Sequence, residues 1–114
     1  MKVRVVDDEP DIQPLFEQRF RREIRGGELN FAFAHSGEDA LVYLQRHASE
    51  VVLILSDINM PGVSGLELLR RIKAGYPGKP MVMMITVGGD PQNHQKALAY
   101  GANDFLTKPI MKFQ

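Results

Sequence analysis

Short apolar runs alternate along the chain with segments of helical periodicity. The runs that suit β-strands cover residues 3–6, 29–34, 51–55, 81–85 and 104–107. Between successive runs, apolar residues recur every three or four positions, which is the spacing of an amphipathic helix. Five strands alternating with four helices predict an α/β fold in which a parallel sheet is wound on both faces through right-handed crossovers.

The expected helices carry start signals in the sequence. Asp11 is the predicted N-cap of a single first helix that ends at a Gly-Gly pair, and Pro14 fits its first turn because an N–H there needs no partner. Ser36 is the predicted cap of the second helix, and Ser64 forms a capping box with Glu67 for the third. These signals place each helix shortly after a strand.

One predicted strand is more apolar than the others, and one predicted helix is less apolar than the others. Residues 51–55 are apolar without interruption, which suits a strand covered on both faces, so we place this strand at the centre of the sheet. The fourth helix, expected from Asp90 to about Tyr100, has polar side chains at 92–96 and therefore little apolar face. We expect this helix to be held loosely.

Composition narrows the classes of protein that the chain can represent. Its 114 residues have the length of one domain, so residues 1–114 are treated as a single unit. The 14 basic and 14 acidic residues balance, whereas a binder of nucleic acid or anionic lipid usually has a basic excess. Cysteine is absent, the three histidines lack the spacing of a metal cluster, and no apolar stretch has the length of a membrane span. We expect a cytoplasmic protein with surface histidines and no direct contact with nucleic acid or membrane.

Polar side chains gather where the predicted strands end. Open parallel sheets bind ligands at the carboxyl ends of their strands, near the point where strand order reverses. The residues at these ends are Asp7, Asp8, Asp57, Asn59, Thr86 and Lys108. Clustered carboxylates repel one another unless a cation offsets them, and oxygen ligands favour Mg²⁺, which also binds phosphate oxygens. We therefore expect Asp7, Asp8 and Asp57 to form a Mg²⁺ site that takes a phosphate ligand.

The other groups at this edge suit phosphoryl transfer. Lys108 supplies a positive charge for the phosphoryl oxygens, and Thr86 supplies a hydroxyl donor. A carboxylate beside a metal-polarised phosphoryl group can form an aspartyl phosphate, which is a known covalent intermediate. The central carboxylate, Asp57, is the expected nucleophile.

Several motifs occur in a fixed order along the chain. They are VVDDEP at 5–10, LSDINMPG at 55–62, Ser64, Gly65, Thr86, Gly101, Ala102, Asp104, Phe105, Lys108 and Pro109. In the order and spacing of these motifs the sequence resembles the receiver domain of response regulators, over nearly the whole chain. The resemblance implies a flavodoxin-like sheet with strand order 2-1-3-4-5.

The resemblance also implies a role for each acidic residue. Asp57 would accept a phosphoryl group from a histidine kinase or a phosphotransfer protein. Asp8 and Asp57 would ligate Mg²⁺ directly together with the Asn59 carbonyl, and Asp7 would assist through water. The domain would then catalyse only its own phosphorylation and dephosphorylation, so that it is a signalling switch and not an enzyme with other substrates.

The last third of the chain both follows the family pattern and departs from it. Thr86 and Phe105 match the pair of residues that relays the switch, and the family implies a cis bond between Lys108 and Pro109 that aims the lysine at the acidic residues. Val87 is a departure, because the residue after the switch threonine is usually small. We expect its branched side chain to crowd phosphoryl access or the movement of Thr86, and so to slow the reaction.

The second departure is the fifth helix that the family normally has after the position of Lys108. Its absence would open the sheet face beside Leu106 and the first helix, and a tail with Met111 and Phe113 is too short to cover several hundred Å² of apolar surface. We therefore expect self-association through this face or a rearranged first helix.

Two other classes of function remain as alternatives. The first is a phosphorylation-independent interaction module, if Val87 and the short end disable switching. The second is a haloacid-dehalogenase-like phosphatase, in which the nucleophile follows the first strand and a second Asp stands two places on. Here Asp7 is followed by Asp8 and Glu9, which disfavours the phosphatase. Acyl-phosphate formation with a small phosphodonor distinguishes the three classes.

Overall fold

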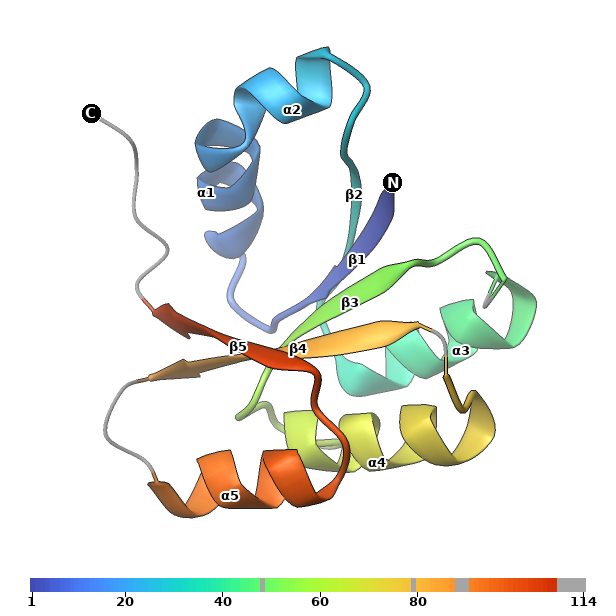
Figure 1. Ribbon diagram of the computed structural model, residues 1–114. Helices are drawn as coiled ribbons and strands as arrows, with labels where there is room; N and C mark the ends of the chain where they lie inside the picture. Colours follow the sequence, from blue (N-terminus) through green and yellow to red (C-terminus); the bar gives the residue numbers. More distant parts are fainter. Residues whose placement is uncertain (48, 79, 88–90, 109–114) are drawn as a thin grey trace.

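The structure, a computed structural model, describes residues 1–47, 49–78, 80–87 and 91–108 (Figure 1). The strands are β1 (Lys2–Val6), β2 (Asn30–Ala34), β3 (Leu53–Asp57), β4 (Met81–Val87) and β5 (Asp104–Lys108). The helices are α1 (Ile12–Arg19), α2 (Arg21–Arg25), α3 (Gly37–His47), α4 (Gly65–Gly75) and α5 (Pro91–Ala99). Each strand is thus separated from the next by helical structure, as the hydrophobic periodicity predicts, with two helices between β1 and β2.

All five strands form one parallel sheet in the order β2-β1-β3-β4-β5. Helices α1 and α2 lie on one face of the sheet, and α3, α4 and α5 lie on the other (Figure 1). This arrangement confirms the predicted doubly wound sheet and its strand order. The central strand is β3, as predicted, although it begins at Leu53, two residues later than the apolar run.

Two hydrophobic cores, one on each face, hold the sheet and helices together. On the first face, α1 contributes Ile12 and Phe16 to a core with alternate residues of the strands. On the second face, the inner sides of α3, α4 and α5 form a larger core. Neighbouring residues of β5 divide between the two, because Phe105 packs against the second core and Leu106 against the first. This division follows from the alternation of side chains along a strand.

The single first helix of the prediction is wrong, because the backbone leaves the helical conformation at Phe20 and divides it into α1 and α2. The Phe20 ring packs 5.8 Å from the ring of Phe16 and 5.5 Å from that of Phe31 on β2, measured between centroids. We attribute the break to this packing, which a local periodicity does not reveal. The described residues accordingly contain five helices where four were predicted.

The three predicted helix starts that lie among the described residues are confirmed, two of them with a side-chain hydrogen bond. The Ser36 hydroxyl accepts a hydrogen bond from the backbone N–H of Asp39, and the Ser64 hydroxyl accepts one from that of Glu67, both at 3.1 Å. Asp11 does occupy the N-cap position of α1, but its side chain makes no capping hydrogen bond and its backbone is already helical. The predicted position of Asp11 is therefore confirmed, although its side chain adds no capping hydrogen bond.

Helix α5 has the small apolar contact that its polar sequence predicts, with Ala97 as its buried residue.

Three predictions fall outside the described residues. They are the cap at Asp90, the isomer of the Lys108–Pro109 bond, and the tail with Met111 and Phe113. None of the helices in the described part of the chain combines the length and the apolar character that a bilayer crossing requires.

Candidate functional site

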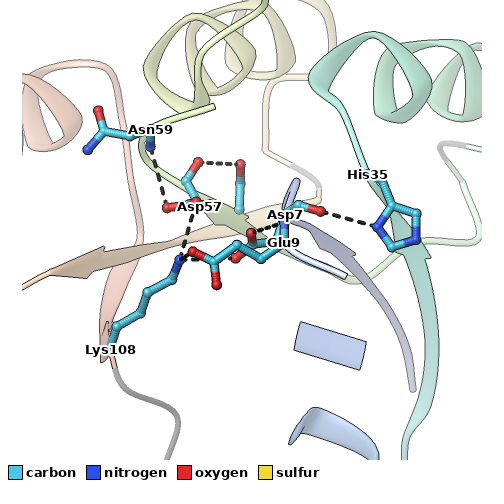
Figure 2. A network of polar contacts seen from close by, with 7 residues as sticks. Asp7, Glu9, His35, Asp57, Asn59 and Lys108 are labelled. Carbon is cyan, nitrogen blue, oxygen red and sulfur yellow. Dashed lines mark hydrogen bonds and ion pairs between the residues drawn. The ribbon is translucent and has the colours of Figure 1, made fainter. Parts of the chain in front are cut away.

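The site lies at the carboxyl ends of the strands, where the sequence predicted it. Asp7 and Asp8 directly follow β1, Asp57 is the last residue of β3, and Lys108 is the last residue of β5. Because the strands are parallel, these ends meet at one edge of the sheet, and Figure 2 shows Asp7, Asp57 and Lys108 directed toward one another. Residues more than a hundred positions apart in the chain thus share one site.

Three carboxylates are close enough to share a cation. One oxygen from each of Asp7, Asp8 and Asp57 lies within 4.8 Å of the others. Asp7 is 0% exposed and Asp57 is 6% exposed, whereas Asp8 is exposed to solvent. The site therefore has a buried floor with two carboxylates and one open side that bears the third.

The ammonium of Lys108 lies among these acidic groups. Its Nζ is 3.3 Å from the Oδ2 atoms of both Asp7 and Asp57, and 3.6 Å from Oε1 of the exposed Glu9. Its side chain is only 17% exposed. A single positive charge is thus placed between two buried carboxylates, which leaves the group with net negative charge.

The backbone after β3 is held in place around Asp57. The N–H of Asn59 donates to Oδ1 of Asp57 at 3.4 Å, and the N–H of Ile58 donates to the carbonyl of Ile85 at 3.0 Å. At the start of α4, a Cβ on Gly65 would overlap the carbonyl oxygen of Asp57 and come within 2.7 Å of Cα of Ile58. Only glycine permits this approach, so the first turn of α4 packs directly on the backbone that carries Asp57.

The electrostatics of the site favour a bound cation. Burial raises the pKa of Asp57 above its usual value, and the Asp7 carboxylate raises it further, although Lys108 and the Asn59 N–H partly oppose the shift. Burial alone would lower the pKa of Lys108, but the carboxylates of Asp57 and Asp7 outweigh it and raise that pKa. The lysine remains an ammonium ion, and its charge alone does not relieve the repulsion between the carboxylates.

The donor set fits a hard divalent cation. Oδ2 of Asp7 is buried and accepts no hydrogen bond among the described residues, although it lies within ion-pair distance of Lys108. A buried carboxylate oxygen without a hydrogen bond is costly, and Lys108 offsets this cost only in part because its single charge is shared between Asp7 and Asp57. Three carboxylates with one exposed side suit Mg²⁺, which binds few protein oxygens and retains water or phosphate ligands.

The predicted switch residues lie on strands beside this group. Thr86 is half-buried near the end of β4, where it pairs with Thr107 of β5, and among the described residues it makes no hydrogen bond to the acidic side chains. Strand alternation places Thr86 and Phe105 on the same face of the sheet, since Phe105 pairs with Met84, two residues before Thr86. Val87 follows at the end of β4 with 65% of its surface exposed.

Three neighbouring groups were not given a role by the sequence. Glu9 approaches Lys108, and its backbone N–H donates to Oδ1 of Asp7 at 2.9 Å, the local turn that an Asp two residues earlier favours. Nδ1 of His35 lies 3.3 Å from the carbonyl oxygen of Asp7 (Figure 2). His94 is exposed, as predicted for a surface histidine, but its ring stacks on that of Phe105.

Comparisons with known proteins agree on one family. The family model of the response regulator receiver domain matches residues 3–114. The chain is 31% identical to response regulator RppA of Synechocystis over 97% of this chain and 45% of that protein. It is 40% identical to the DNA-binding transcriptional regulator NtrC of Proteus hauseri, over 95% of this chain and 21% of that protein. The chain thus spans less than half the length of these curated relatives.

Solved structures lead to the same family. The crystal structure of the receiver domain of NtrX from Brucella abortus superimposes with a TM-score of 0.80. It is 32% identical in sequence and aligns over 98% of this chain and 87% of that one. Fold and sequence therefore give the same relationship.

Proposed function

The chain belongs to the response regulator receiver family of two-component signal transduction, and we propose that Asp57 is its phosphoryl acceptor. The observation that carries the proposal is the position of the Asp57 carboxylate. It is buried at the end of the central strand, 3.3 Å from Lys108, and close enough to Asp7 and Asp8 to share a cation with them. The phosphoryl donor would be a histidine kinase or a phosphotransfer protein.

In the proposed reaction an oxygen of Asp57 attacks the phosphorus of a phosphohistidine. The new O–P bond replaces the N–P bond, and the imidazole nitrogen that leaves takes up a proton. Attack of water on phosphorus later returns inorganic phosphate and the free carboxylate. In both steps Lys108 offsets negative charge on the phosphoryl oxygens, and Thr86 donates a hydrogen bond to one of them.

We further propose that Asp8, Asp57 and the Asn59 carbonyl hold Mg²⁺ directly, with Asp7 acting through water. When bound, the ion offsets the charge that develops on the phosphoryl oxygens. Asp7 and Glu9 keep Lys108 at the site, since both lie within ion-pair distance of its Nζ. The exposed side at Asp8 leaves the acceptor reachable from solvent.

Phosphorylation would be relayed through Thr86 and Phe105. The same-face placement of the two residues and the small buried surface of α5 support this relay, because a weakly held helix is displaced at low cost. The prediction of no direct nucleic-acid partner rests on the neutral charge of this chain. It does not extend to longer relatives, one of which is named as DNA-binding.

Incubation with acetyl phosphate and Mg²⁺, followed by intact mass measurement, tests the acceptor. We expect one phosphoryl group on the wild type and none on Asp57→Asn, with Asp11→Asn as a matched control that labels normally. Chelation of Mg²⁺ should also prevent labelling. Undiminished labelling of Asp57→Asn at the same site would contradict the proposal, and wild-type protein that never labels would favour the phosphorylation-independent module.

The mass experiment also separates the phosphatase alternative. A haloacid-dehalogenase-like enzyme would label Asp7, which follows the first strand, and would then label Asp57→Asn as well as the wild type. The geometry disfavours this outcome, since Asp7 is fully buried while Asp57 retains some exposure. Phosphopeptide mapping of the wild type identifies the labelled aspartate directly.

A further inference from the structure

A polar cavity lies at the opposite end of the strands from Asp57. It has a volume of about 150 Å³ and is lined by Lys2, Val3, Arg4, Asn30, Ala32, Tyr43 and Val51. Lys2 and Asn30 are the first residues of β1 and β2, so the cavity is at the amino ends of the strands, beside α3. Cavities of about this volume hold ligands the size of benzene, which exceeds the size of a phosphate ion.

Arg4 is the central cation of this cavity. Its Cζ lies 3.8 Å from the centre of the Tyr43 ring, a cation–π contact that occupies the face of the guanidinium. Its Nε is buried and finds no hydrogen-bond partner among the described residues. Because Nε has almost no exposed surface, an anion in the cavity would contact the terminal amino groups of Arg4, which are not among the buried unpaired atoms. A hydrogen bond from these groups to an ion would offset the unfavourable burial of the guanidinium.

The charges around Arg4 do not neutralise it by direct contact. Burial lowers the pKa of Arg4, and Tyr43 and Asp39 only partly offset this effect. Asp39 forms no ion pair with Arg4 among the described residues. The carboxylate of Glu50 contacts Lys2 at 3.5 Å through one oxygen and His47 at 2.6 Å through the other. The weak and exposed contact between Lys2 and Glu50 is open to exchange for a better acceptor.

We propose that this cavity binds a small phosphate-class anion, held by the guanidinium edge of Arg4 with help from Lys2 and the Asn30 amide. The stacked guanidinium presents its N–H groups in one plane, which is the geometry that recognises phosphate oxygens. Two cations of β1 and an amide of the neighbouring strand β2 offer donors from several directions, which suits a tetrahedral ion better than a planar carboxylate. The bound ion would stabilise the packing of the amino ends of β1 and β2 on α3. This site would be distinct from the phosphoryl acceptor.

The test is a titration of the Mg²⁺-free protein followed by NMR, with inorganic phosphate in one arm and glycerol 3-phosphate in another, at constant ionic strength. We expect saturable shifts at Lys2, Asn30 and Tyr43 in at least one arm. Binding in both arms shows that the cavity accepts phosphate monoesters, and binding in the first alone shows that it accepts free phosphate only. An arm with acetate should give at least about tenfold weaker binding, the cost of a lost charge-assisted hydrogen bond.

Variants separate the site from general charge effects. Arg4→Lys keeps the positive charge but loses the planar donor edge, and should weaken phosphate binding about tenfold. Arg46→Lys, on the exposed side of α3, is the matched control and should bind as the wild type does. The proposal is overturned if phosphate causes no saturable shifts around the cavity, if acetate binds equally well, or if Arg4→Lys, with an unchanged amide spectrum elsewhere, binds as tightly as the control.

Discussion

The imidazole ring of His94 on α5 stacks on the phenyl ring of Phe105 on β5, with centroids 3.8 Å apart and planes inclined by 18°. Among the residues of α5, Ala97 is the buried one. The histidine thus joins a weakly packed helix to the aromatic residue that we propose as part of the relay. If Phe105 moves, it either breaks this stacking contact or moves α5 with it.

Removal of the His94 ring should loosen α5. An aromatic pair contributes about 0.5–1.5 kcal/mol, so His94→Ala should speed amide exchange in residues 91–99 about two- to tenfold. Gln92→Ala, at an exposed position of the same helix, is the matched control and should leave exchange nearly unchanged. Equal exchange in His94→Ala and the control, measured by mass spectrometry, would show that the stack does not hold the helix.

Asp57→Asn should stabilise the protein in the absence of Mg²⁺. The substitution removes one of two buried carboxylates that repel each other, while Lys108 keeps its contacts with Asp7 and Glu9. Mg²⁺ at about a hundred times its Kd should then stabilise the wild type by about 2.7 kcal/mol, and the variant much less. Thermal unfolding with and without the ion measures both effects. If Mg²⁺ raises the unfolding free energy of the variant as much as that of the wild type, Asp57 is not a ligand of the ion.

The contribution of Glu67 to stability should depend on pH. Its carboxylate accepts hydrogen bonds from Arg70 and Arg71, which lower its pKa from 4.5 to about 2. Because the folded pKa is below the unfolded one, the stabilisation is complete above pH 4.5 and is lost as pH falls toward 2. The difference in unfolding free energy between wild type and Glu67→Gln should therefore be constant near neutrality and shrink in that window. High salt should reduce this free-energy difference at neutral pH, because it screens the ion pairs of Glu67. A difference that grows on acidification would show that these ion pairs do not stabilise the folded state.

Two glycines of α4 should respond in opposite directions to alanine. A Cβ at Gly65 meets the backbone of Asp57 and Ile58, so Gly65→Ala should destabilise the protein by about 1–3 kcal/mol. Gly75, at the other end of the helix, has open space around it, and Gly75→Ala should stabilise by about 0.4–1 kcal/mol. Urea unfolding measures both. Similar unfolding free energies for the two variants would mean that α4 can move away from the end of β3 at little cost in stability.

The sheet face beside α1 is the surface where we expect self-association. Leu53, Met83 and Leu106 are half-buried there, at the edge of the core built around Phe16. The weight-average mass of the 114-residue chain should rise with concentration in light scattering, and Leu106→Gln should reduce the rise. A strictly monomeric chain at high concentration, with Leu106 covered by its own residues, would show this expectation to be wrong.

Val87 offers a test of the departure from the family pattern. Its side chain is mostly exposed, so Val87→Ala should change stability by less than about 0.5 kcal/mol. If the branched side chain crowds the acceptor or Thr86, the same variant should phosphorylate faster with acetyl phosphate. An unchanged rate would mean that Val87 does not restrict access.

The sequence predicted the parts of the molecule that local chemistry determines. An uninterrupted apolar run marks the central strand β3, and strand ends bring Asp7, Asp57 and Lys108 together because all five strands are parallel. The break at Phe20 was not predictable in this way, since it depends on a ring of β2 that is distant in sequence. The stack on Phe105 was missed for the same reason, because an exposed histidine gives no periodic signal of its partner.

The division of Phe105 and Leu106 between the two cores makes the alignment of β5 against β4 part of the site. In a strand, a slip of one residue turns every side chain to the other face. Such a slip would exchange the aromatic ring for Leu106 beside α5 and turn the ammonium of Lys108 away from the carboxylates. The pairing of Met83 with Asp104 and of Val87 with Lys108 therefore sets the charge balance at Asp57 as well as the shape of the sheet edge. A variant that shifts this pairing would lose the lysine and the relay together, without any change in a site residue.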